Sequence, residues 1–369
     1  MLNLKTRKKQ RLTLNKRTKI ALGLSGGVDS ATSAALLLAA GYEVVGVTCI
    51  FHDDASSRTA VTDAANVCAK LGIQHVVHNV CAQFEENVVV PFCESYVAGE
   101  TPSPCVLCNR TCKMPSLIEV ADSLGCERIA TGHYARVVQG AVDPGRFAVE
   151  RSLDPAKDQS YMLSLLTQEQ LSRLVLPLGS WSKKDVRAQA EEHAIPVAHK
   201  AESQDVCFFE GDYRDFLQER GYKGKPGPII TQSGKEVGIH QGLPNYTLGQ
   251  RKGLGVALGK PAFVLGKDEA NNALIVGFKE ESYLRALTVG GVNWMASEPI
   301  QGSFECAVKI RYRSSAVPCT AQLHSDGTVC ICFENPQPLT SPGQFAVMYH
   351  GEVVLAGGCI TKVEFAPVS

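Results

Sequence analysis

The segment Ala21–Ser30 constrains the fold of this chain more than any other part of the sequence. It reads ALGLSGGVDS: an apolar run, Ile20–Leu24, enters a Ser-Gly-Gly turn, and an Ala/Leu-rich stretch, Ala31–Ala40, follows. This order predicts a buried strand, a tight turn and the start of a helix. A helix start presents unpaired N–H groups and the positive end of the backbone dipole. The turn is therefore predicted to bind an anion, and a phosphate is the natural one.

The residue types of the turn support the same interpretation. Gly26 and Gly27 allow the backbone to approach an anion because they have no Cβ, and Ser25 and Ser30 add hydroxyl donors. No lysine directly follows the glycines. The turn is therefore not the GxxxxGK[ST] loop that holds a γ-phosphate.

Length and charge limit the overall organisation. The chain has 369 residues, which predicts two or three domains, and it contains no apolar run long enough for a membrane span. Eight Lys/Arg and no acid fall in the first 19 residues, so the rest carries 29 basic and 37 acidic residues. Nucleic acid would then be contacted by local patches or by the basic arm. Fourteen cysteines without an export signal indicate a reducing compartment, the cytoplasm.

The first part of the chain alternates β-branched runs with longer helical patterns. We expect strands at Lys19–Leu24, Glu43–Cys49, His75–Val80 and Arg128–Thr131, and helices near Asp29–Ala40, Ser57–Leu71, Ala82–Ala98 and Thr111–Leu124. Apolar strands separated by helices predict an α/β fold with a parallel, doubly wound sheet. Ligands of such sheets bind beyond the carboxyl ends of the strands, which should bring the SGGVDS turn, Cys49 and Gly132–His133 to one edge.

After Gly221 the chain becomes rich in Gly and Pro, and short alternating runs replace the helices. This pattern predicts a small β-rich central domain followed by a C-terminal β-barrel-like domain. The expected organisation is a basic arm at 1–18, a nucleotide-binding catalytic domain at 19–220, the central domain at 221–287 and the barrel domain at 288–369.

A second informative segment is TPSPCVLCNRTCK, residues 101–113. Its two prolines predict an extended loop that displays Cys105 and Cys108, and Cys207 lies far downstream in ESQDVCFF. A structural zinc is disfavoured because the chain has no second CxxC and no H-x₃₋₅-H pair. Two chemistries stay open: sulfur transfer between Cys108 and Cys207, or a [4Fe–4S] cluster held by Cys105, Cys108 and Cys207 with one iron open.

Two polar segments have both a plain and a functional interpretation. DPAKDQSY, residues 154–161, is either a solvated turn or a group of donors and acceptors that orients a polar substrate. In a strand expected at Phe304–Tyr312, Lys309, Arg311 and Arg313 would share one face by period two. Such a basic face beside Tyr312 suits a phosphate backbone, although a solvated strand has the same pattern.

The ordered set SGGVDS, TPSPCVLCN, ATGHYAR, DPAKDQSY, ESQDVCF, GQRKGLG and KIRYR resembles the tRNA-specific 2-thiouridylases, from about Lys19 to Val363. SGGVDS matches the pyrophosphatase loop of enzymes that adenylate a substrate with ATP. The resemblance implies that the C2 oxygen of a wobble uridine in tRNA attacks the α-phosphate, which releases pyrophosphate and turns that oxygen into part of a good leaving group, AMP.

The resemblance also implies residue roles. Cys207 would carry a persulfide supplied by a sulfur-donor protein, a cysteine desulfurase or a sulfur relay carrier, and Cys108 would be the nucleophile that ends in a disulfide with Cys207. Asp29 would help to hold Mg²⁺. ATP would be bound by Gly23, Leu24, Ser25, Gly26, Gly27, Val28, Asp29, Ser30, Cys49 and Gly132. tRNA would be contacted by Ser103, Pro104, Cys105, His133, Lys157, Asp158, Gln159, Arg311, Tyr312 and Gln344.

The sequence departs from this family in the loop that contacts the target base. The family's best-studied form has Asn-Pro-Asp there, whereas this chain has Ser103-Pro104-Cys105. The loss of Asp removes a candidate acid/base group, and the gain of Cys105 creates the CxxC-plus-distant-Cys pattern of related enzymes with a [4Fe–4S] cluster. The persulfide route and the cluster route both stay open at this point.

Two rival functions are considered. An amidating synthetase of the same ATP-pyrophosphatase superfamily would have no use for Cys105, Cys108 and Cys207. A non-catalytic RNA-binding protein would leave the SGGVDS turn unexplained.

Overall fold

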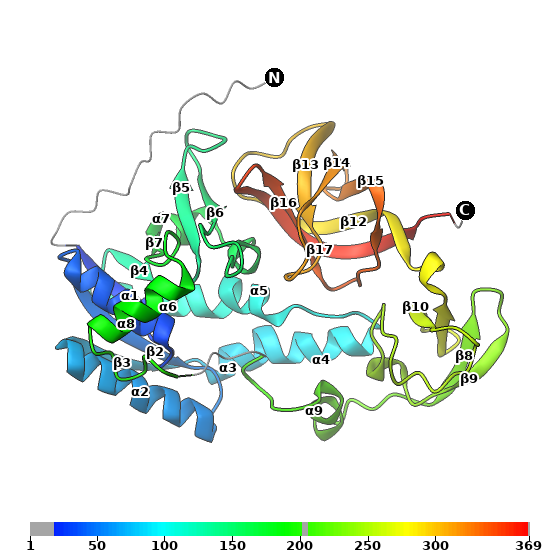
Figure 1. Ribbon diagram of the computed structural model, residues 1–369, viewed down its shortest axis with the longest axis horizontal. Coiled ribbons are helices and arrows are strands. Elements are labelled where there is room, and N and C mark those ends of the chain that lie inside the picture. The colour runs from blue at the N-terminus through cyan, green and yellow to red at the C-terminus, as the bar shows by residue number, and fades with distance from the viewer. Residues whose placement is uncertain (1–17, 201–205, 368–369) are drawn as a thin grey trace. The chain divides into compact units, whose positions relative to one another are not determined.

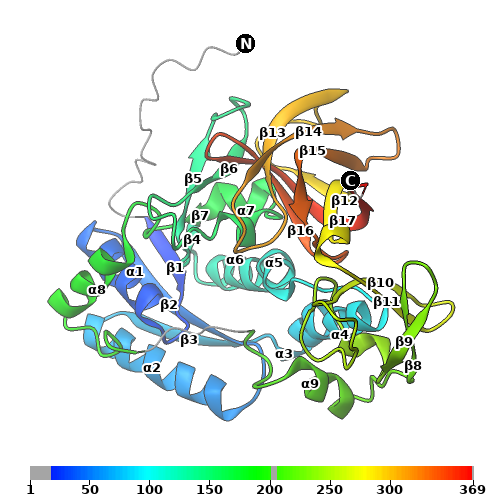
Figure 2. The ribbon, with the colours of Figure 1, turned by 45° about the vertical axis from the view of Figure 1, so that its right-hand side comes forward.

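A computed structural model describes residues 18–200 and 206–367 of the protein (Figures 1 and 2). The predicted basic arm, except Thr18, lies outside the described residues. The described chain forms two compact units. The first contains residues 18–79, 115–159 and 169–200, and the second contains residues 80–114, 160–168 and 206–367.

The first unit is built on a parallel sheet, as predicted. Its strand order is β3-β2-β1-β4-β7, and every pairing in it is parallel. The strands are β1 (Lys19–Gly23), β2 (Glu43–Ile50), β3 (Gln74–Asn79), β4 (Arg128–Ala130) and β7 (Leu174–Val175). Strands β5 (Ala135–Gln139) and β6 (Phe147–Arg151) form an antiparallel hairpin.

Helices cover both faces of this sheet. Ile20 and Leu22 of β1 pack in one buried cluster with residues of α1 and α2. A Cβ at Gly23 would point instead to Leu117 of α6, 3.2 Å away, and side chains of a strand alternate between the two faces. The helices of this unit are α1 (Val28–Ala39), α2 (Ala55–Leu71), α6 (Met114–Ser123), α7 (Gln168–Arg173) and α8 (Lys183–Glu192). Figure 1 shows α1 and α8 side by side.

The second unit begins with a helical segment. The predicted single helix near Ala82–Ala98 is interrupted by a π-helical turn, and a second such turn follows Cys108. The elements are α3 (Cys81–Phe84), η1 (Glu85–Val89), α4 (Val90–Val97), α5 (Pro104–Cys108), η2 (Asn109–Lys113), η3 (Ser160–Leu163) and α9 (Tyr213–Glu219). Phe92 and Tyr96 of α4 form a buried cluster with Leu217 of α9.

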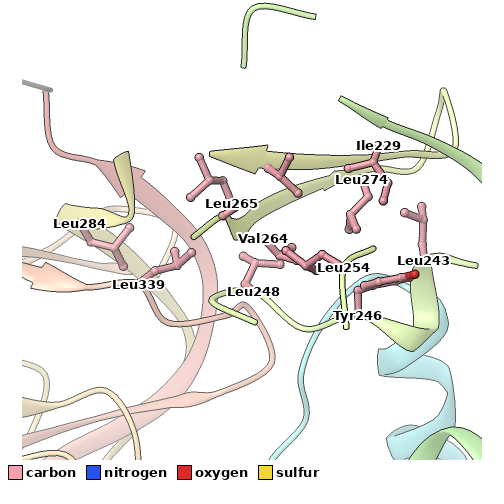
Figure 3. Close-up of a cluster of buried hydrophobic side chains, with 12 residues drawn as sticks. Ile229, Leu243, Tyr246, Leu248, Leu254, Val264, Leu265, Leu274, Leu284 and Leu339 are labelled. Atoms are coloured by element: carbon pink, nitrogen blue, oxygen red, sulfur yellow. The ribbon is translucent and has the colours of Figure 1, made fainter. Parts of the chain in front are cut away.

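A small four-stranded sheet of order β10-β11-β8-β9 follows. Its strands are β8 (Gly227–Thr231), β9 (Glu236–His240), β10 (Phe263–Asp268) and β11 (Ala273–Gly277), with short 3-10 turns η4 (Leu243–Asn245) and η5 (Lys279–Glu281). Figure 3 shows Ile229 and Leu274 of this sheet turned toward Leu243 and Leu254 of the connecting segment. Burial of these apolar side chains stabilises the small sheet.

The C-terminal strands form a closed antiparallel barrel, which confirms the predicted barrel-like domain. The order is β12-β15-β14-β13-β16-β17, and pairing of β12 with β17 closes it. The strands are β12 (Tyr283–Trp294), β13 (Ser303–Lys309), β14 (Val317–Leu323), β15 (Val329–Pro338), β16 (Phe345–His350) and β17 (Val353–Phe365). Closure leaves no exposed edge in the barrel.

The prediction of a basic strand face at Lys309, Arg311 and Arg313 is wrong. Strand β13 ends at Lys309. The chain then turns, because the backbone N–H of Ser314 donates to the carbonyl of Arg311 at 3.2 Å. Arg311 and Arg313 are exposed in this turn, whereas Lys309 is only 8% exposed. None of the helices in the described parts of the chain is long and apolar enough to cross a membrane.

Tyr161 provides a test of the second unit's packing. Its side chain is fully buried, and its hydroxyl donates to the carbonyl of Phe345 at 3.0 Å and accepts from the N–H of Phe345 at 3.3 Å. Tyr161→Phe leaves both groups of Phe345 without this partner, so we expect the free energy of unfolding to fall by about 1–3 kcal/mol. Urea unfolding measures the change. Tyr283→Phe, at a half-buried position, should change it by less than about 0.5 kcal/mol, and equal losses in the two variants would contradict this account.

Candidate active site

The Ser-Gly-Gly turn joins β1 to α1 as predicted. Helix α1 begins at Val28, and its N-cap residue, Gly27, provides no side chain to bind the first N–H groups. Gly26 has φ +69°, a left-handed conformation that glycine adopts readily, and a Cβ there would lie 2.7 Å from the carbonyl oxygen of Ala60. The glycines thus leave the start of α1 open to an anion.

An ion pair lies in the first turn of α1. The Asp29 carboxylate accepts hydrogen bonds from Lys183 Nζ at 2.7 and 2.8 Å and from the Tyr134 hydroxyl at 2.7 Å. Lys183 also lies 5.7 Å from the centre of the Tyr134 ring. The carboxylate of Asp29, the ammonium group of Lys183 and the phenol of Tyr134 therefore meet at the turn. Only Asp29 was predicted from the sequence.

A second lysine reaches the turn from another segment. Lys200 Nζ donates to the carbonyl of Gly26 at 3.2 Å and to Asp63 at 2.6 Å. Two cations, Lys183 and Lys200, therefore lie beside a turn suited to phosphate. One feature of the sequence could have pointed to Lys183. It is the first residue of helix α8, where the helix dipole disfavours a positive charge, so a lysine there suggests a nearby anionic partner.

The carboxyl end of β4 lies against the turn. A Cβ at Gly132 would be 2.8 Å from the backbone nitrogen of Ser30, so only glycine allows this approach. His133 Nδ1 is hydrogen-bonded to the Thr131 hydroxyl at 2.8 Å. Cys49 is a half-buried residue of β2 whose register partner is His78 of β3.

The DPAKDQSY segment makes specific bonds within the first unit. Asp158 is only 8% exposed and accepts from the N–H of Ser152 at 3.2 Å, and Gln159 Oε1 accepts from the N–H of Tyr134 at 2.9 Å. Asp154 accepts from the N–H of Lys183 at 3.1 Å. Asp154 and Gln159 thereby help to position the two residues that hold Asp29. Lys157 is half-buried in the same turn.

The predicted extended loop at Cys105 and Cys108 is wrong. Pro104 begins helix α5, and both cysteines lie on this helix. Proline suits the first helical position because its φ is already helical and its missing N–H would have no partner there. Cys105 is exposed, whereas Cys108 is 8% exposed and lies immediately before the π-helical turn η2.

The surroundings of Cys108 hold its thiol in the neutral form. Burial raises its pKa to about 12; Lys113 opposes this shift, and Cys207, Cys112 and Cys105 add to it. The influence of Cys207 on Cys108 indicates that these two predicted partners lie near each other in the second unit.

Aromatic packing holds the segment that carries Cys207. The ring of Phe208, the next residue, lies 5.0 Å from Phe92 of α4 and 5.7 Å from Phe84 of α3, and Cys207 itself is exposed. Residues 202–205 of the ESQDVCF motif lie outside the described residues. Across residues 18–200 and 206–367, no three Cys, His, Asp or Glu side chains form a group that could hold a metal ion.

The residues before α5 are fixed by the barrel. Gln344 Nε2 donates to the carbonyls of Thr101 and Pro102 at 2.8 and 3.2 Å. Ser103 precedes α5 as its N-cap without a side-chain bond to it. Arg311 donates to the carbonyl of Leu339, and the Tyr312 ring centre lies 6.1 Å from that of Tyr161.

The raised pKa of Cys108 gives a pH-dependent prediction. At about pH 8 only about one Cys108 thiol in ten thousand is ionised, so alkylation by iodoacetamide is slow and its rate rises about tenfold per pH unit up to about pH 10. Peptide mass spectrometry measures the rate at Cys108, and Cys108→Ser identifies the peptide. A plateau below about pH 9 would contradict the raised pKa.

Three family models match most of the chain. Residues 18–211 match the family model described as a tRNA methyl transferase HUP domain, residues 214–278 its PRC-barrel domain, and residues 284–360 an aminomethyltransferase beta-barrel domain. Among solved structures, 57% of the chain aligns with 66% of the U34-tRNA thiolase NcsA from Methanococcus maripaludis, at 18% identity and a TM-score of 0.36. A 4-thiouridine synthetase–RNA complex aligns with 52% of the chain, over 45% of its own length, at 19% identity and a TM-score of 0.36.

The curated relatives match over nearly their full length. The tRNA-specific 2-thiouridylase MnmA of Chloroflexus aurantiacus is 43% identical over 358 residues, which cover 94% of this chain and 99% of the relative. The enzyme of the same description from Moorella thermoacetica is 45% identical over 354 residues, 93% of this chain and 99% of the relative. Identity at this level over nearly the full length shows that the chain belongs to the tRNA-specific 2-thiouridylase family.

Proposed function

We propose that this protein is a tRNA-uridine 2-sulfurtransferase that replaces the C2 oxygen of a wobble uridine with sulfur and consumes ATP. The full-length identity to 2-thiouridylases is the observation that carries the proposal. Two features of the fold support it: an uncapped helix start with nearby cations, and thiols gathered around α5. In this proposal the protein acts in the cytoplasm. Its partners there are the tRNA and a sulfur-donor protein, either a cysteine desulfurase or a relay carrier.

The SGGVDS turn is the proposed ATP site. Its residues are Gly23, Leu24, Ser25, Gly26, Gly27, Val28, Asp29 and Ser30, together with Cys49 and Gly132. In the proposed first step, the C2 oxygen attacks the α-phosphorus and pyrophosphate leaves. The open N–H groups of α1 bind phosphate oxygens, and Lys183 and Lys200 offset their negative charge. C2 is then bonded to AMP, a far better leaving group than the original oxygen.

The thiols supply the second half of the reaction. The terminal sulfur of a Cys207 persulfide adds to C2, and AMP leaves. Cys108, as a thiolate, then attacks Sγ of Cys207; the sulfur–sulfur bond breaks, and its electron pair stays on the sulfur of the 2-thiouridine. Cys108 and Cys207 end as a disulfide that a cellular thiol reduces. This step needs the thiolate of Cys108; burial raises the pKa of that thiol, and Lys113 offsets part of the shift.

The residues present fit one of the two inorganic cofactors. Asp29 offers the oxygen ligand that Mg²⁺ prefers, and Mg²⁺ often binds one carboxylate together with substrate phosphates. Asp29 would hold it once Lys183 leaves the carboxylate, and bound Mg²⁺ would neutralise phosphate charge. The thiols of Cys105, Cys108 and Cys207 do not form a metal-binding group within the described residues, so no step is derived through a [4Fe–4S] cluster.

The proposed tRNA contacts fall in both units. In the first unit they are His133 and Lys157, Asp158 and Gln159. In the second they are Ser103, Pro104 and Cys105 at the start of α5, with Arg311, Tyr312 and Gln344 of the barrel. Asp158 and Gln159 already bind backbone N–H groups, so their contribution to tRNA binding includes holding the local chain in place.

The central test is mass spectrometry of tRNA nucleosides after incubation with ATP, Mg²⁺ and a sulfide or persulfide source. We expect 2-thiouridine with the unchanged protein. Cys108→Ser and Cys207→Ser remove the two sulfurs of the proposed disulfide, so turnover should fall by about a hundredfold or more. Cys332→Ser changes an exposed thiol on β15 of the barrel and is the matched control, with unchanged turnover expected.

Other outcomes would contradict the proposal. Full 2-thiouridine formation in both cysteine variants would contradict the roles proposed for Cys108 and Cys207, and a methylated nucleoside favours methyl transfer. The absence of tRNA-stimulated exchange between ATP and pyrophosphate favours a non-catalytic RNA-binding protein. Brown, iron- and sulfide-containing protein after anaerobic purification would support the cluster route in place of the persulfide.

Gly132 offers a test of the ATP site. In Gly132→Ala the new methyl group would lie 2.8 Å from the backbone nitrogen of Ser30, so the turn must shift. The cost of about 1–3 kcal/mol should lower kcat/KM for ATP by about tenfold or more. ATP titration of pyrophosphate release measures it. Gly145→Ala, where the nearest atom, Asp143 Oδ1, is 3.6 Å away, should behave like the unchanged protein. Equal activity of both variants would argue against ATP at this turn.

A further inference from the structure

Two cysteines that the proposed reaction does not use face each other in the barrel. Cys306 of β13 is the register partner of Cys319 of β14. Their Sγ atoms lie 3.5 Å apart, and the thiol of Cys319 also donates to the carbonyl oxygen of Cys306 at 3.5 Å. Directly opposed side chains of an antiparallel pair lie on the same face of the sheet. The two thiols are therefore in contact across neighbouring strands.

The backbone at this pair of residues suits a disulfide. The N–H of Leu323 donates to the carbonyl of Gly302 at 3.3 Å in the same ladder, so by alternation Cys306 and Cys319 are one of its hydrogen-bonded pairs. The Cα atoms of such a pair lie about 5.5 Å apart, within the range of about 4.4–6.8 Å that disulfides span. The sulfurs need to approach by only about 1.5 Å to form a bond, so the strands can keep their register.

The two thiols differ in their access to solvent. Cys319 is fully buried, whereas Cys306 is half-buried. The hydrogen bond with Cys306 and burial raise the pKa of the Cys319 thiol, which keeps this thiol neutral. A solute from outside can therefore reach Cys306 but not Cys319. A small oxidant such as hydrogen peroxide fits this access better than a bulky disulfide such as oxidised glutathione.

We propose that Cys306 and Cys319 form a peroxide-responsive thiol pair that closes a reversible disulfide between β13 and β14. Cys306, as a thiolate, attacks one oxygen of hydrogen peroxide; the O–O bond breaks, hydroxide leaves with the proton that Cys306 released, and Cys306 becomes a sulfenic acid. The sulfur of Cys319 then attacks Sγ of Cys306, the S–O bond breaks, and the departing hydroxide takes the Cys319 thiol proton. Two thiols and one peroxide thus give one disulfide and two waters, and a dithiol reductant reverses the change.

The disulfide restricts the hairpin that these two strands form. It closes a ring from Cys306 to Cys319, and this ring contains the turn at residues 311–314. A cross-link of this kind restricts the open and unfolded forms of a chain more than its native form. Local opening of β13 and β14 therefore becomes rarer after oxidation, and their backbone N–H groups exchange with solvent more slowly.

The test treats the reduced full-length protein with submillimolar hydrogen peroxide, alkylates the remaining thiols with iodoacetamide and digests the protein with trypsin in the absence of reductant. In this digest Cys306 is the one cysteine of peptide 286–309, and Cys319 lies in peptide 314–362. We expect most molecules to give the two peptides joined, lighter than their sum by two hydrogen atoms, and dithiothreitol to separate them. Equal yields with oxidised glutathione at the same concentration would overturn the assignment of a small oxidant.

Variants identify the partner, because peptide 314–362 holds three further cysteines. Cys319→Ala should abolish the joined peptide and leave Cys306 as a sulfenic acid that dimedone traps. Cys332→Ser is the matched control: it changes an exposed thiol whose register partners are Thr320 and Ala286, so the joined peptide should persist. A joined peptide in Cys319→Ala would place the disulfide elsewhere and overturn the proposal.

Cys306→Ser tests the order of the two steps. Because Cys319 is fully buried, peroxide should leave it as a free thiol in this variant, and iodoacetamide should alkylate it after unfolding. Oxidation of Cys319 in the absence of Cys306 would overturn the assignment of Cys306 as the thiol that reacts first.

Hydrogen exchange measured by mass spectrometry tests the effect on the hairpin. After peroxide treatment, exchange in β13 and β14 should slow by about tenfold or more, and dithiothreitol should restore the original rate. Cys306→Ser should show no change. Cys306 recovered as sulfinic or sulfonic acid without the joined peptide would overturn the disulfide, and a joined peptide with unchanged exchange would overturn its effect on the hairpin. None of these outcomes depends on 2-thiouridine formation.

Discussion

The rest of the structure depends on one constraint: the start of helix α1 must stay open to an anion while it is packed tightly on every other side. Gly26 turns the chain in a left-handed conformation beside Ala60, and Gly132 approaches the nitrogen of Ser30 from the end of β4. A side chain at either place would fill the space or displace the turn. The parallel sheet supplies this arrangement, because the carboxyl ends of β1 and β4 meet at one edge.

The ion pair of Asp29 with Lys183 follows from the same constraint. An anion site without its anion leaves positive partial charge at the helix start, and Asp29 in the first turn offsets it. Lys183, itself placed at the start of a helix where a cation is disfavoured, is held there by this carboxylate.

Cys105 and Cys108 lie on a helix and not on an extended loop, and burial sets the protonation state of the Cys108 thiol. Pro104 was interpreted as a helix breaker, yet at the first helical position it begins α5 and brings Cys105 and Cys108 onto one helix. Burial then raises the pKa of Cys108 although Lys113 opposes the shift, and this keeps the thiol in the neutral form. The hydrogen bond from Gln344 to the carbonyl of Thr101 connects the residues just before this helix to the barrel.

The sequence by itself determined the parallel sheet, the glycine turn at the start of α1 and the closed barrel. These features follow from local patterns: apolar runs of strand length, glycines where a Cβ would clash, and alternation of period two. Only the tertiary structure decided that Lys183, Lys200 and Tyr134 meet the turn, and that Arg311 lies in a turn beyond β13. These contacts join residues far apart in the chain, and their charges and hydroxyls carry no periodic signal, so their partners are set by packing alone.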